Sequence, residues 1–399
     1  MSHPHKKYET NPKLYLAFIF IVLIALPGAL MALMHIAHSP VAGAIIFGIS
    51  IFAAATVLAW AAEVAQMDMS QALAVTILAL VAVLPEYAVD IVFTWKAGLG
   101  DEPSHHYAIA NMTGANRLLV GLGWPVILFL FIWAKKKKEV LLKDDQRLEV
   151  FYISLAALYA FIVVLKGSLT IFDTLILVSI YGFYSKRSAS MESPEPDLVG
   201  PVKIVANLNK LPRRNATALM FAFAGLVIFF VAEPFAESLV SAGEVLGIDK
   251  FLLVQWLAPI ASEMPEFIIA ATWTLRGEAA SSIKALSSSL VNQFTLLVGS
   301  IPLVYSLAAG HVSVFELDSF QKHEIFLTAA QCVFGAAVLV SLRLSRTSGI
   351  LLLLLFLAQL IVPGIRVEAG VVYLVFAVIY LFKRRLSILP AIKTGIGMK

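Results

Sequence analysis

Long apolar runs follow one another along nearly the whole chain, and short polar or basic stretches separate them. A helix needs about 17 to 25 mostly apolar residues to cross the hydrocarbon core of a bilayer, so each such run predicts a transmembrane helix. The runs are 14–37, 41–67, 71–97, 106–134, 149–165, 168–184, 215–246, 252–276, 280–308, 324–344, 348–364 and 368–383. The pattern therefore predicts an all-α membrane protein with about 12 transmembrane helices.

The composition excludes a soluble protein. Hydrophobic residues make up 60% of the chain and charged residues only 14%, whereas soluble domains carry about 25% charged residues. The single cysteine, Cys332, lies in an apolar run, which leaves no disulfide framework or thiolate metal cluster and predicts a packing residue. Lysines precede the first run, which lacks a small-residue cleavage site, so we expect a retained helix and not a signal peptide.

Basic residues are distributed unevenly among the predicted loops. With a cytoplasmic N-terminus, the inside segments hold 24 of the 30 Lys and Arg residues, and the outside loops hold five. This asymmetry predicts a multi-pass protein of the cell membrane with both termini in the cytoplasm. Because the bases orient the helices in this way, the net charge of +4 gives no reason to expect a nucleic-acid partner.

Two prolines, each followed by a glutamate, occupy matching places in two halves of the chain, at Leu84-Pro85-Glu86 and Met264-Pro265-Glu266. The polar stretch 185–214 divides these halves and reads as a cytoplasmic linker. Five predicted helices lie in 41–184 and five in 215–364, and an odd number reverses the direction of the second set. The sequence therefore predicts two inverted five-helix repeats. Residues 1–40 and 365–399 each add one helix and a terminal tail.

The Pro-Glu pairs carry the chemistry of a cation site. A proline inside a helix frees the carbonyl four residues earlier, here of Val81 and Ala261, and the glutamate adds a negative charge. Glu86 shares a helix face with Asp90, four residues on, and Glu266 shares one with Glu263. Ionisable groups at membrane depth mark ion paths, so four carboxylates are predicted to converge.

Neutral oxygens on nearby positions extend this predicted site. The helices that follow the Pro-Glu pairs carry Asn111 and Asn116 in the first half, and Ser287 and Asn292 in the second. Carboxylate, amide and hydroxyl oxygens together suit hard cations such as Ca²⁺ or Na⁺. The alternative is that these amides and hydroxyls only bridge membrane helices.

In these motifs the chain resembles the calcium/cation antiporter superfamily, which comprises sodium/calcium exchanger-like membrane proteins with two inverted alpha repeats. Each repeat of that family carries a G-T-S-L-P-E-like motif and, on the next helix, a G-N/D-x-x-G-S-N-like motif. The resemblance implies that Glu86 and Glu266 are the principal cation ligands. It also implies ligand roles for Asn111, in Ala110-Asn111-Met112-Thr113-Gly114, and for Ser287 at the corresponding place.

The chain departs from the family pattern at three places. Where the family has Gly-Thr-Ser, the first repeat has Val81-Ala82-Val83, and the second has Ala261-Ser262-Glu263, with a hydroxyl and an extra acid. Arg117 adds a permanent positive charge inside a predicted span. It must pair or reach water. We expect it to pair with Asp90 or Glu263, or to take the place of a bound cation and so modulate the site's charge; the alternative is a packing role near the interface.

These observations predict a secondary active antiporter that exchanges Ca²⁺ or Na⁺ for Na⁺ or H⁺ by alternating access. Two alternatives remain, a Na⁺/H⁺ exchanger without Ca²⁺ transport and a cation channel. No cofactor is expected, and the partners are the lipid bilayer and the transported inorganic cations. An enzyme is not expected, because the chain has no H-E-x-x-H motif and Gly98-Leu99-Gly100-Asp101 ends in a polar loop.

Overall fold

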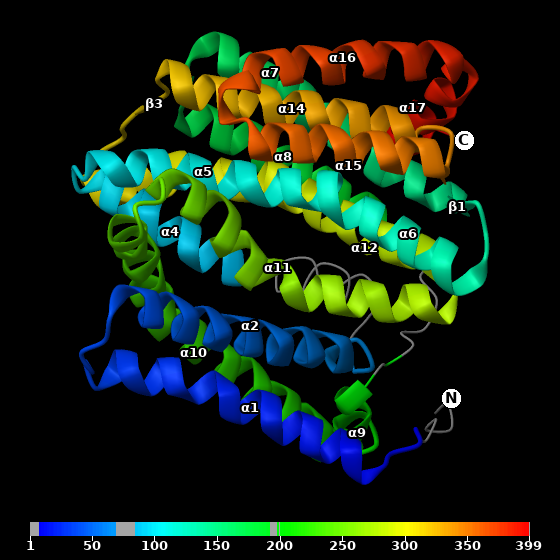
Figure 1. Cartoon of the computed structure of the whole chain (residues 1–399). Coiled ribbons are helices and arrows are strands. Elements are labelled where there is room, and N and C mark those ends of the chain that lie inside the picture. The colour runs from blue at the N-terminus through cyan, green and yellow to red at the C-terminus, as the bar shows by residue number, and fades with distance from the viewer. Residues whose placement is uncertain (1–7, 69–83, 192–197, 199, 399) are drawn as a thin grey trace. The chain divides into compact units, whose positions relative to one another are not determined.

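The computed structural model describes residues 8–68, 84–191, 198 and 200–398. They form a mainly helical membrane protein, as the apolar pattern predicts, and the chain divides into two compact units (Figure 1). Unit 1 comprises Met1–Val89, Ala189–Leu253 and Ala261–Pro265, and unit 2 comprises Asp90–Ser188, Val254–Ile260 and Glu266–Lys399.

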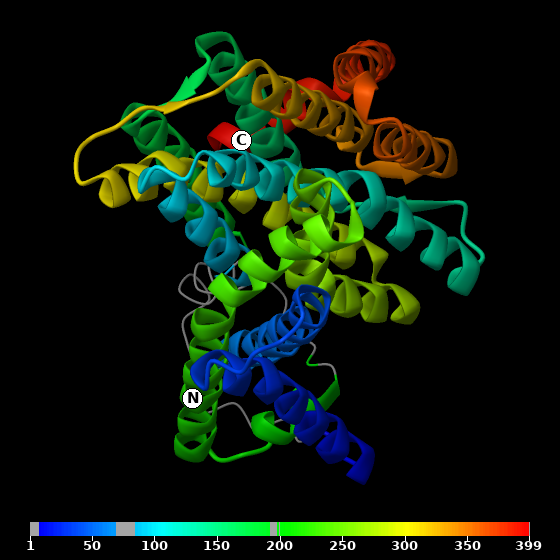
Figure 2. The same ribbon diagram turned by 60° about the vertical axis from the view of Figure 1, so that its left-hand side comes forward.

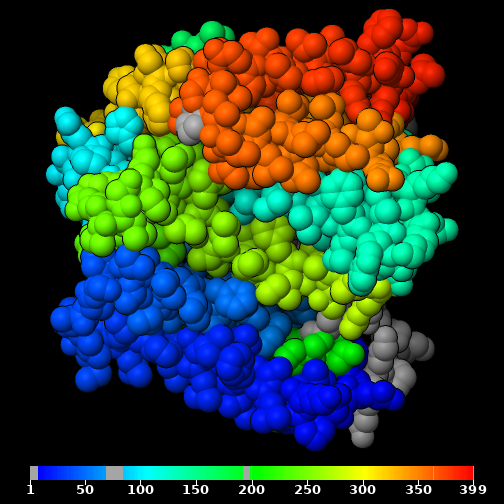
Figure 3. All heavy atoms as spheres, in the orientation of Figure 1, coloured from blue at the N-terminus to red at the C-terminus, as the bar shows by residue number. Residues whose placement is uncertain are grey.

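Unit 1 is built around three long helices. Among its described residues lie α1 (Pro12–Leu33), α2 (Pro40–Ala65), η3 (Gly200–Val202), α9 (Lys203–Ala206) and α10 (Lys210–Leu246). α2 packs along α10, and α1 contacts both (Figure 2). Small residues allow close approach: the Gly28 amide donates to Ser50 Oγ at 3.0 Å. Leu16, Ile19 and Phe20 of α1 are exposed, as expected of a lipid-facing helix; α1 is the dark blue segment of Figure 3.

Asp68, just beyond the end of α2, forms an ion pair with Arg213 of α10 and so connects these two parts of unit 1. The guanidinium donates from Nε and Nη2 to the two carboxylate oxygens, each at 2.8 Å. The Asp68 side chain is 7% exposed. These hydrogen bonds, together with the nearby positive charges, hold the pKa of Asp68 below its ordinary value against the opposing effect of burial.

Unit 2 contains most of the remaining helices, which pack around α14, α7 and α5. Its elements are α5 (Glu102–Leu118), η1 (Leu119–Gly123), α6 (Trp124–Lys135), β1 (Glu139–Leu141), η2 (Asp144–Gln146), α7 (Arg147–Lys166), β2 (Ser168–Leu169), α8 (Ile171–Ala189), α12 (Ala279–Asn292), η4 (Gln293–Leu297), α13 (Val298–Ala309), β3 (Phe315–Glu316), α14 (Ser319–Leu339), β4 (Arg343–Ser345), α15 (Arg346–Ile361), η5 (Pro363–Ile365), α16 (Arg366–Lys383), η6 (Arg385–Ser387) and α17 (Ile388–Ile396). The helices α4 (Leu84–Gly98) and α11 (Lys250–Arg276) each contribute several residues to both units.

Two short antiparallel ladders connect distant parts of unit 2. β1 pairs with β4, with Val140 opposite Leu344, and β2 pairs with β3, with Leu169 opposite Phe315. Each ladder lies beside a helix end of unit 2, since β2 follows α7 and β4 precedes α15.

Local sequence explains where many helices begin and end. Asn11, Ser39 and Asp101 accept hydrogen bonds from the first turns of α1, α2 and α5, and each of these helices has a proline in its first turn. Gly167 and Gly310 end α7 and α13 in the left-handed conformation, which glycine adopts without steric strain.

By length and composition, seven helical segments among the described residues can cross a membrane. They are Pro12–Leu33, Pro40–Ala65, Glu102–Lys135, Asp144–Lys166, Lys210–Leu246, Lys250–Arg276 and Ala279–Ala309. Arg346–Ile361 is a shorter apolar helix. The span predicted at 71–97 lies outside the described residues up to 83, and its described part is α4. α10 begins at Lys210 and not at 215, so part of the predicted linker is helical.

Candidate cation site

The two Pro-Glu pairs lie on α4 and α11. The described part of α4 begins at Leu84, and Glu86 and Asp90 are both 1% exposed. On α11 the helix runs unbroken through Pro265. The proline therefore frees the Ala261 carbonyl without ending the helix. Val81, the corresponding residue of the first half, lies outside the described residues.

The predicted site residues fall into both compact units. Glu86, Ser262 and Glu263 belong to unit 1, and all three are buried. The others belong to unit 2: Asp90, Asn111, Asn116, Arg117, Glu266, Ser287 and Asn292. Among the described residues, no three His, Cys, Asp or Glu side chains are arranged to hold a metal ion together.

Within unit 2 the structure brings Asp90 of α4 and Asn111 of α5 together. The Asn111 side chain is close enough to interact with the Asp90 carboxyl, yet Asp90 Oδ1 and both amide atoms of Asn111 have no hydrogen bond of normal geometry among the described residues. Buried polar atoms are nearly always satisfied in proteins. This pair therefore offers buried oxygen atoms that a cation can bind.

A second contact joins Glu266 of α11 to α12. The Ser289 hydroxyl donates to Glu266 Oε2 at 2.6 Å. Ser287, two residues earlier on α12, is 2% exposed, and its hydroxyl has no hydrogen-bond partner among the described residues. The sequence alone did not show which of the three serines at 287–289 faces α11.

The Asn116 side-chain amide nitrogen donates to the Met112 carbonyl of its own helix at 2.7 Å. Its oxygen remains buried without a partner among the described residues and so is available as a ligand. A π-helical turn follows directly in each half: η1 begins three residues after Asn116, and η4 begins at Gln293, just after Asn292. π turns inside α-helices occur frequently at functional sites.

The prediction that Arg117 pairs with Asp90 or Glu263 was wrong. Arg117 Nη2 donates to Glu324 Oε2 of α14 at 2.5 Å, and both side chains are almost wholly buried. The reason is helical geometry: six residues beyond Asn111, Arg117 points about 120° away from the Asn111 side chain. Its guanidinium also lies 5.1 Å from the Trp256 ring centre. Arg117 is thus neutralised by a residue that the sequence did not connect with it.

Glu324 is the centre of a buried network that joins several helices of unit 2. Arg366, at the start of α16, donates to its other carboxylate oxygen. Gln255 of α11 donates to Glu324 Oε2 at 2.9 Å and to Thr113 Oγ1 at 3.3 Å. The only signal in the sequence was an acid at the start of the apolar run 324–344, a place where an interfacial residue in water is the ordinary interpretation.

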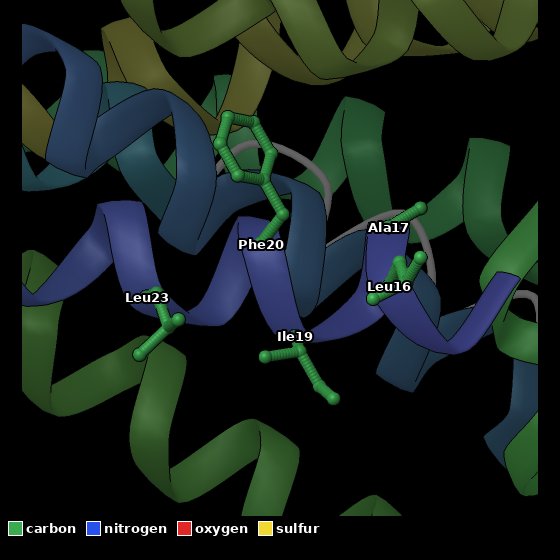
Figure 4. A pocket seen from close by; sticks show the side chains of 5 residues that line it. All are labelled: Leu16, Ala17, Ile19, Phe20 and Leu23. Atoms are coloured by element: carbon green, nitrogen blue, oxygen red, sulfur yellow. The ribbon is translucent and has the colours of Figure 1, made fainter. Parts of the chain in front are cut away.

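A hollow on the surface of α1 has no ionisable lining. About 470 Å³ in volume, it is lined by Leu16, Ala17, Ile19, Phe20 and Leu23 (Figure 4). Carbon-only walls give a metal ion no oxygen ligands. This hollow is therefore not a cation site.

Comparison with known proteins identifies relatives of this arrangement. A family model described as "Sodium/calcium exchanger protein" matches residues 38–186 and 216–363. The crystal structure of the H⁺/Ca²⁺ exchanger CAX is 39% identical, with a TM-score of 0.93 and coverage of 96% of this chain and 98% of that chain. Native YfkE is 14% identical, with a TM-score of 0.65 over 86% of this chain and 98% of that chain. The sodium-calcium exchanger NCX_Mj is 13% identical in sequence, with a TM-score of 0.53, and the match covers 86% of this chain and 99% of that chain. These last two show likeness of fold alone. No curated protein sequence matches the chain significantly.

Proposed function

Because the chain belongs to the sodium/calcium exchanger family, we propose that it is a secondary active antiporter that exchanges Ca²⁺ for H⁺ by alternating access around Glu86 and Glu266. The observation that carries this proposal is the 39% identity over 96% of the chain to the H⁺/Ca²⁺ exchanger CAX. Carboxylates suit both ions, because each can either coordinate Ca²⁺ or take up a proton. Competition for the same oxygens then couples the two fluxes.

The proposed ligands combine the carboxylates with neutral oxygens. Ca²⁺ takes about six to eight oxygen ligands. The proposed set is Glu86, Glu266, Glu263, Asp90, Asn111, Ser262, Ser287, Asn116 and Asn292. Support comes from the buried oxygens of Asp90, Asn111, Asn116 and Ser287 that lack hydrogen-bond partners among the described residues. The transported cation is the cargo of this site, and no cofactor is proposed.

We further propose 12 transmembrane helices and two inverted repeats, 41–184 and 215–364, with the linker 185–214 and both termini in the cytoplasm. Residues 1–40 and 365–399 add the flanking helices. Support comes from the order of elements, since the described residues of each half form two helices, a helix interrupted by a π turn, a strand, a helix, a strand and a helix. The two matched family segments, 38–186 and 216–363, follow the same division. The cell membrane is the proposed location.

Exchange assays with several ions test the function. The purified chain in proteoliposomes is expected to take up Ca²⁺ when the interior is acidic, and to move H⁺ outward at the same time. Na⁺/H⁺ exchange without Ca²⁺ uptake supports the first alternative and overturns the proposal. Ca²⁺ flux that needs no counter-ion on the far side indicates a channel.

Charge-neutral variants test the two principal ligands. Glu86→Gln and Glu266→Gln keep the shape of the side chain but remove its charge, so each is expected to abolish exchange while the protein folds. Glu368→Gln is the matched control, because Glu368 lies exposed in the first turn of α16. Near-normal exchange by either site variant contradicts the assignment.

A further inference from the structure

A second polar cluster lies in unit 2, around Glu149 near the start of α7. Glu149 is 1% exposed. The hydroxyl of Tyr184 on α8 donates to Glu149 Oε1 at 3.3 Å. The same Tyr184 oxygen lies 2.6 Å from Ser288 Oγ of α12, and either hydroxyl can be the donor in that bond. The cluster thus joins three helices through one phenol.

No cation contacts the Glu149 carboxylate directly in the described structure. Lys284, one turn before Ser288, is the nearby base, and its ammonium binds Asp145 at 2.5 Å. Glu149 Oε2 is buried and has no hydrogen-bond partner among the described residues. The donors to this carboxylate are the Tyr184 hydroxyl and the backbone amide of Glu149 itself, and no cation of the described structure touches it, so its negative charge is only partly compensated. The surroundings therefore suit a carboxyl that gains and loses a proton.

The cluster lies between water and the helix that contacts Glu266. The Asp145 and Lys284 side chains are 29% and 31% exposed, so that end of the cluster reaches solvent. Glu149 directly follows the basic stretch 135–148, which the charge asymmetry assigns to the cytoplasm. At the other end, Ser288 is the neighbour of Ser289, the hydrogen-bond donor to Glu266.

We propose that Glu149 is a second proton-binding site, separate from the Pro-Glu carboxylates, through which cytoplasmic pH acts on α12. The protonated carboxyl donates to the Tyr184 oxygen, and Tyr184 then donates to Ser288. When Glu149 releases its proton to water, Tyr184 donates to the carboxylate, and Ser288 must donate to Tyr184. One proton leaves and two hydroxyl hydrogens only rotate, so the charge and the atoms balance. The proposal rests on the proposed Ca²⁺/H⁺ exchange for its link to transport.

The charged groups that act on Glu149 are Lys284 of α12 and Asp145 of η2, and the remaining titratable partner is Tyr184 of α8. Lys284 and Asp145 form an ion pair with each other, so neither alone determines the protonation state of Glu149. Tyr181, one turn before Tyr184, provides a matched control. Its ring centre lies 6.3 Å from that of Tyr184, and its hydroxyl bonds to no described residue.

The transport test compares Glu149→Gln, Tyr184→Phe and Tyr181→Phe in proteoliposomes with varied pH on the cytoplasmic side. Glu149→Gln is expected to remove one step from the pH profile of Ca²⁺/H⁺ exchange and to leave apparent Ca²⁺ affinity at its plateau unchanged. Tyr184→Phe is expected to move that step by about one pH unit to higher pH, because the ionised form loses its donor. Tyr181→Phe should match the wild type. Identical profiles in all four proteins overturn the proposal.

A second measurement does not depend on transport. Infrared difference spectra between acid and neutral pH detect the carboxyl stretch of a buried acid that titrates. A band that is lost in Glu149→Gln, shifted in Tyr184→Phe and retained in Tyr181→Phe supports the site. An unchanged band in Glu149→Gln overturns it. If instead the wild type moves no protons with Ca²⁺ while this band behaves as expected, the proposed function fails and the proton site stands.

Discussion

The Ser289 hydroxyl on α12 donates a 2.6 Å hydrogen bond to Glu266 on α11. A donor to a carboxylate holds its direction and stabilises its charged form. We therefore expect Ser289→Ala to lower apparent cation affinity by about threefold to tenfold, without loss of folding. Thr272→Ala is the control, because that α11 hydroxyl bonds only the carbonyl of its own helix. Equal affinities in the two variants, measured by ion-dependent exchange, contradict a role for this hydrogen bond.

Removing Glu324 should harm the protein more than removing Arg117. Glu324→Gln removes the acid that both Arg117 and Arg366 bind and leaves the buried Arg117 without its ion-pair partner, whereas Arg117→Gln leaves Glu324 bound by Arg366 and Gln255. Breaking a buried ion pair typically lowers stability by about 3 to 5 kcal/mol. Melting in detergent should show the larger loss for Glu324→Gln. The pairing also predicts that Arg117→Gln leaves the number of coupled cations unchanged, and a higher number with unchanged melting speaks against it.

The Asp68–Arg213 pair predicts an acid-dependent part of the stability. Hydrogen bonds from Arg213 lower the pKa of Asp68 below its ordinary value of 3.8. The contribution is therefore complete above pH 3.8 and is lost as pH falls through the lowered pKa. Asp68→Asn should reduce the melting temperature at neutral pH and flatten its fall in acid. Asp144→Asn, whose parent side chain is 90% exposed, should do neither. Equal acid slopes in the wild type and Asp68→Asn rule out this contribution.

At Gly114 the helix α5 closely approaches α11. A Cβ atom at Gly114 would lie 1.8 Å from the Gln255 carbonyl oxygen, a backbone atom that cannot move alone. We expect Gly114→Ala to reduce the yield of monodisperse protein severely, since overpacking at a helix crossing forces the backbones apart. Gly225→Ala on α10 meets no atom within 4 Å and should be neutral or slightly stabilising. Similar yields for both variants contradict the close crossing.

The proposed topology is tested by labelling. Single cysteines at Ser190 and Gly100, in a Cys332→Ala background, report the sides of the linker 185–214 and of the loop before α5. An impermeant thiol reagent should label Ser190→Cys only from the cytoplasmic side and Gly100→Cys only from the outside. Labelling of both from one side contradicts the inverted repeats.

The apolar runs predicted most helices, because a helix that crosses a bilayer must be long and apolar, and both properties can be read from the sequence. The packing role expected for Cys332 is confirmed, since its side chain is fully buried. The α17 helix was missed because it has only nine residues and follows a basic stretch. Its packing against α7, with Gly395 facing Phe151, is a tertiary effect that a tail sequence does not reveal.

Side-chain partners were harder to predict than helices. The alignment of the motifs placed Arg117 near the proposed acids along the chain. A helix turns by about 100° per residue, however, so the Arg117 side chain faces another direction. Glu324 follows Arg117 by 207 residues, and nothing local connects the two. The approach of Asp90 to Asn111 was easier to anticipate, because they lie on consecutive helices, α4 and α5, that each carry a motif of the proposed site.

The long separation between Arg117 and Glu324 has a consequence for biosynthesis. At roughly 5 to 20 residues per second, the ribosome makes Glu324 about 10 to 40 s after Arg117. During that interval α5 carries a permanent charge without its acid, and Arg366 appears later still. We therefore expect the early helices of unit 2 to remain near the translocon or at the lipid–water boundary until α14 is made. Variants truncated before Glu324 should consequently be poor substrates for membrane integration and good ones for quality-control proteolysis.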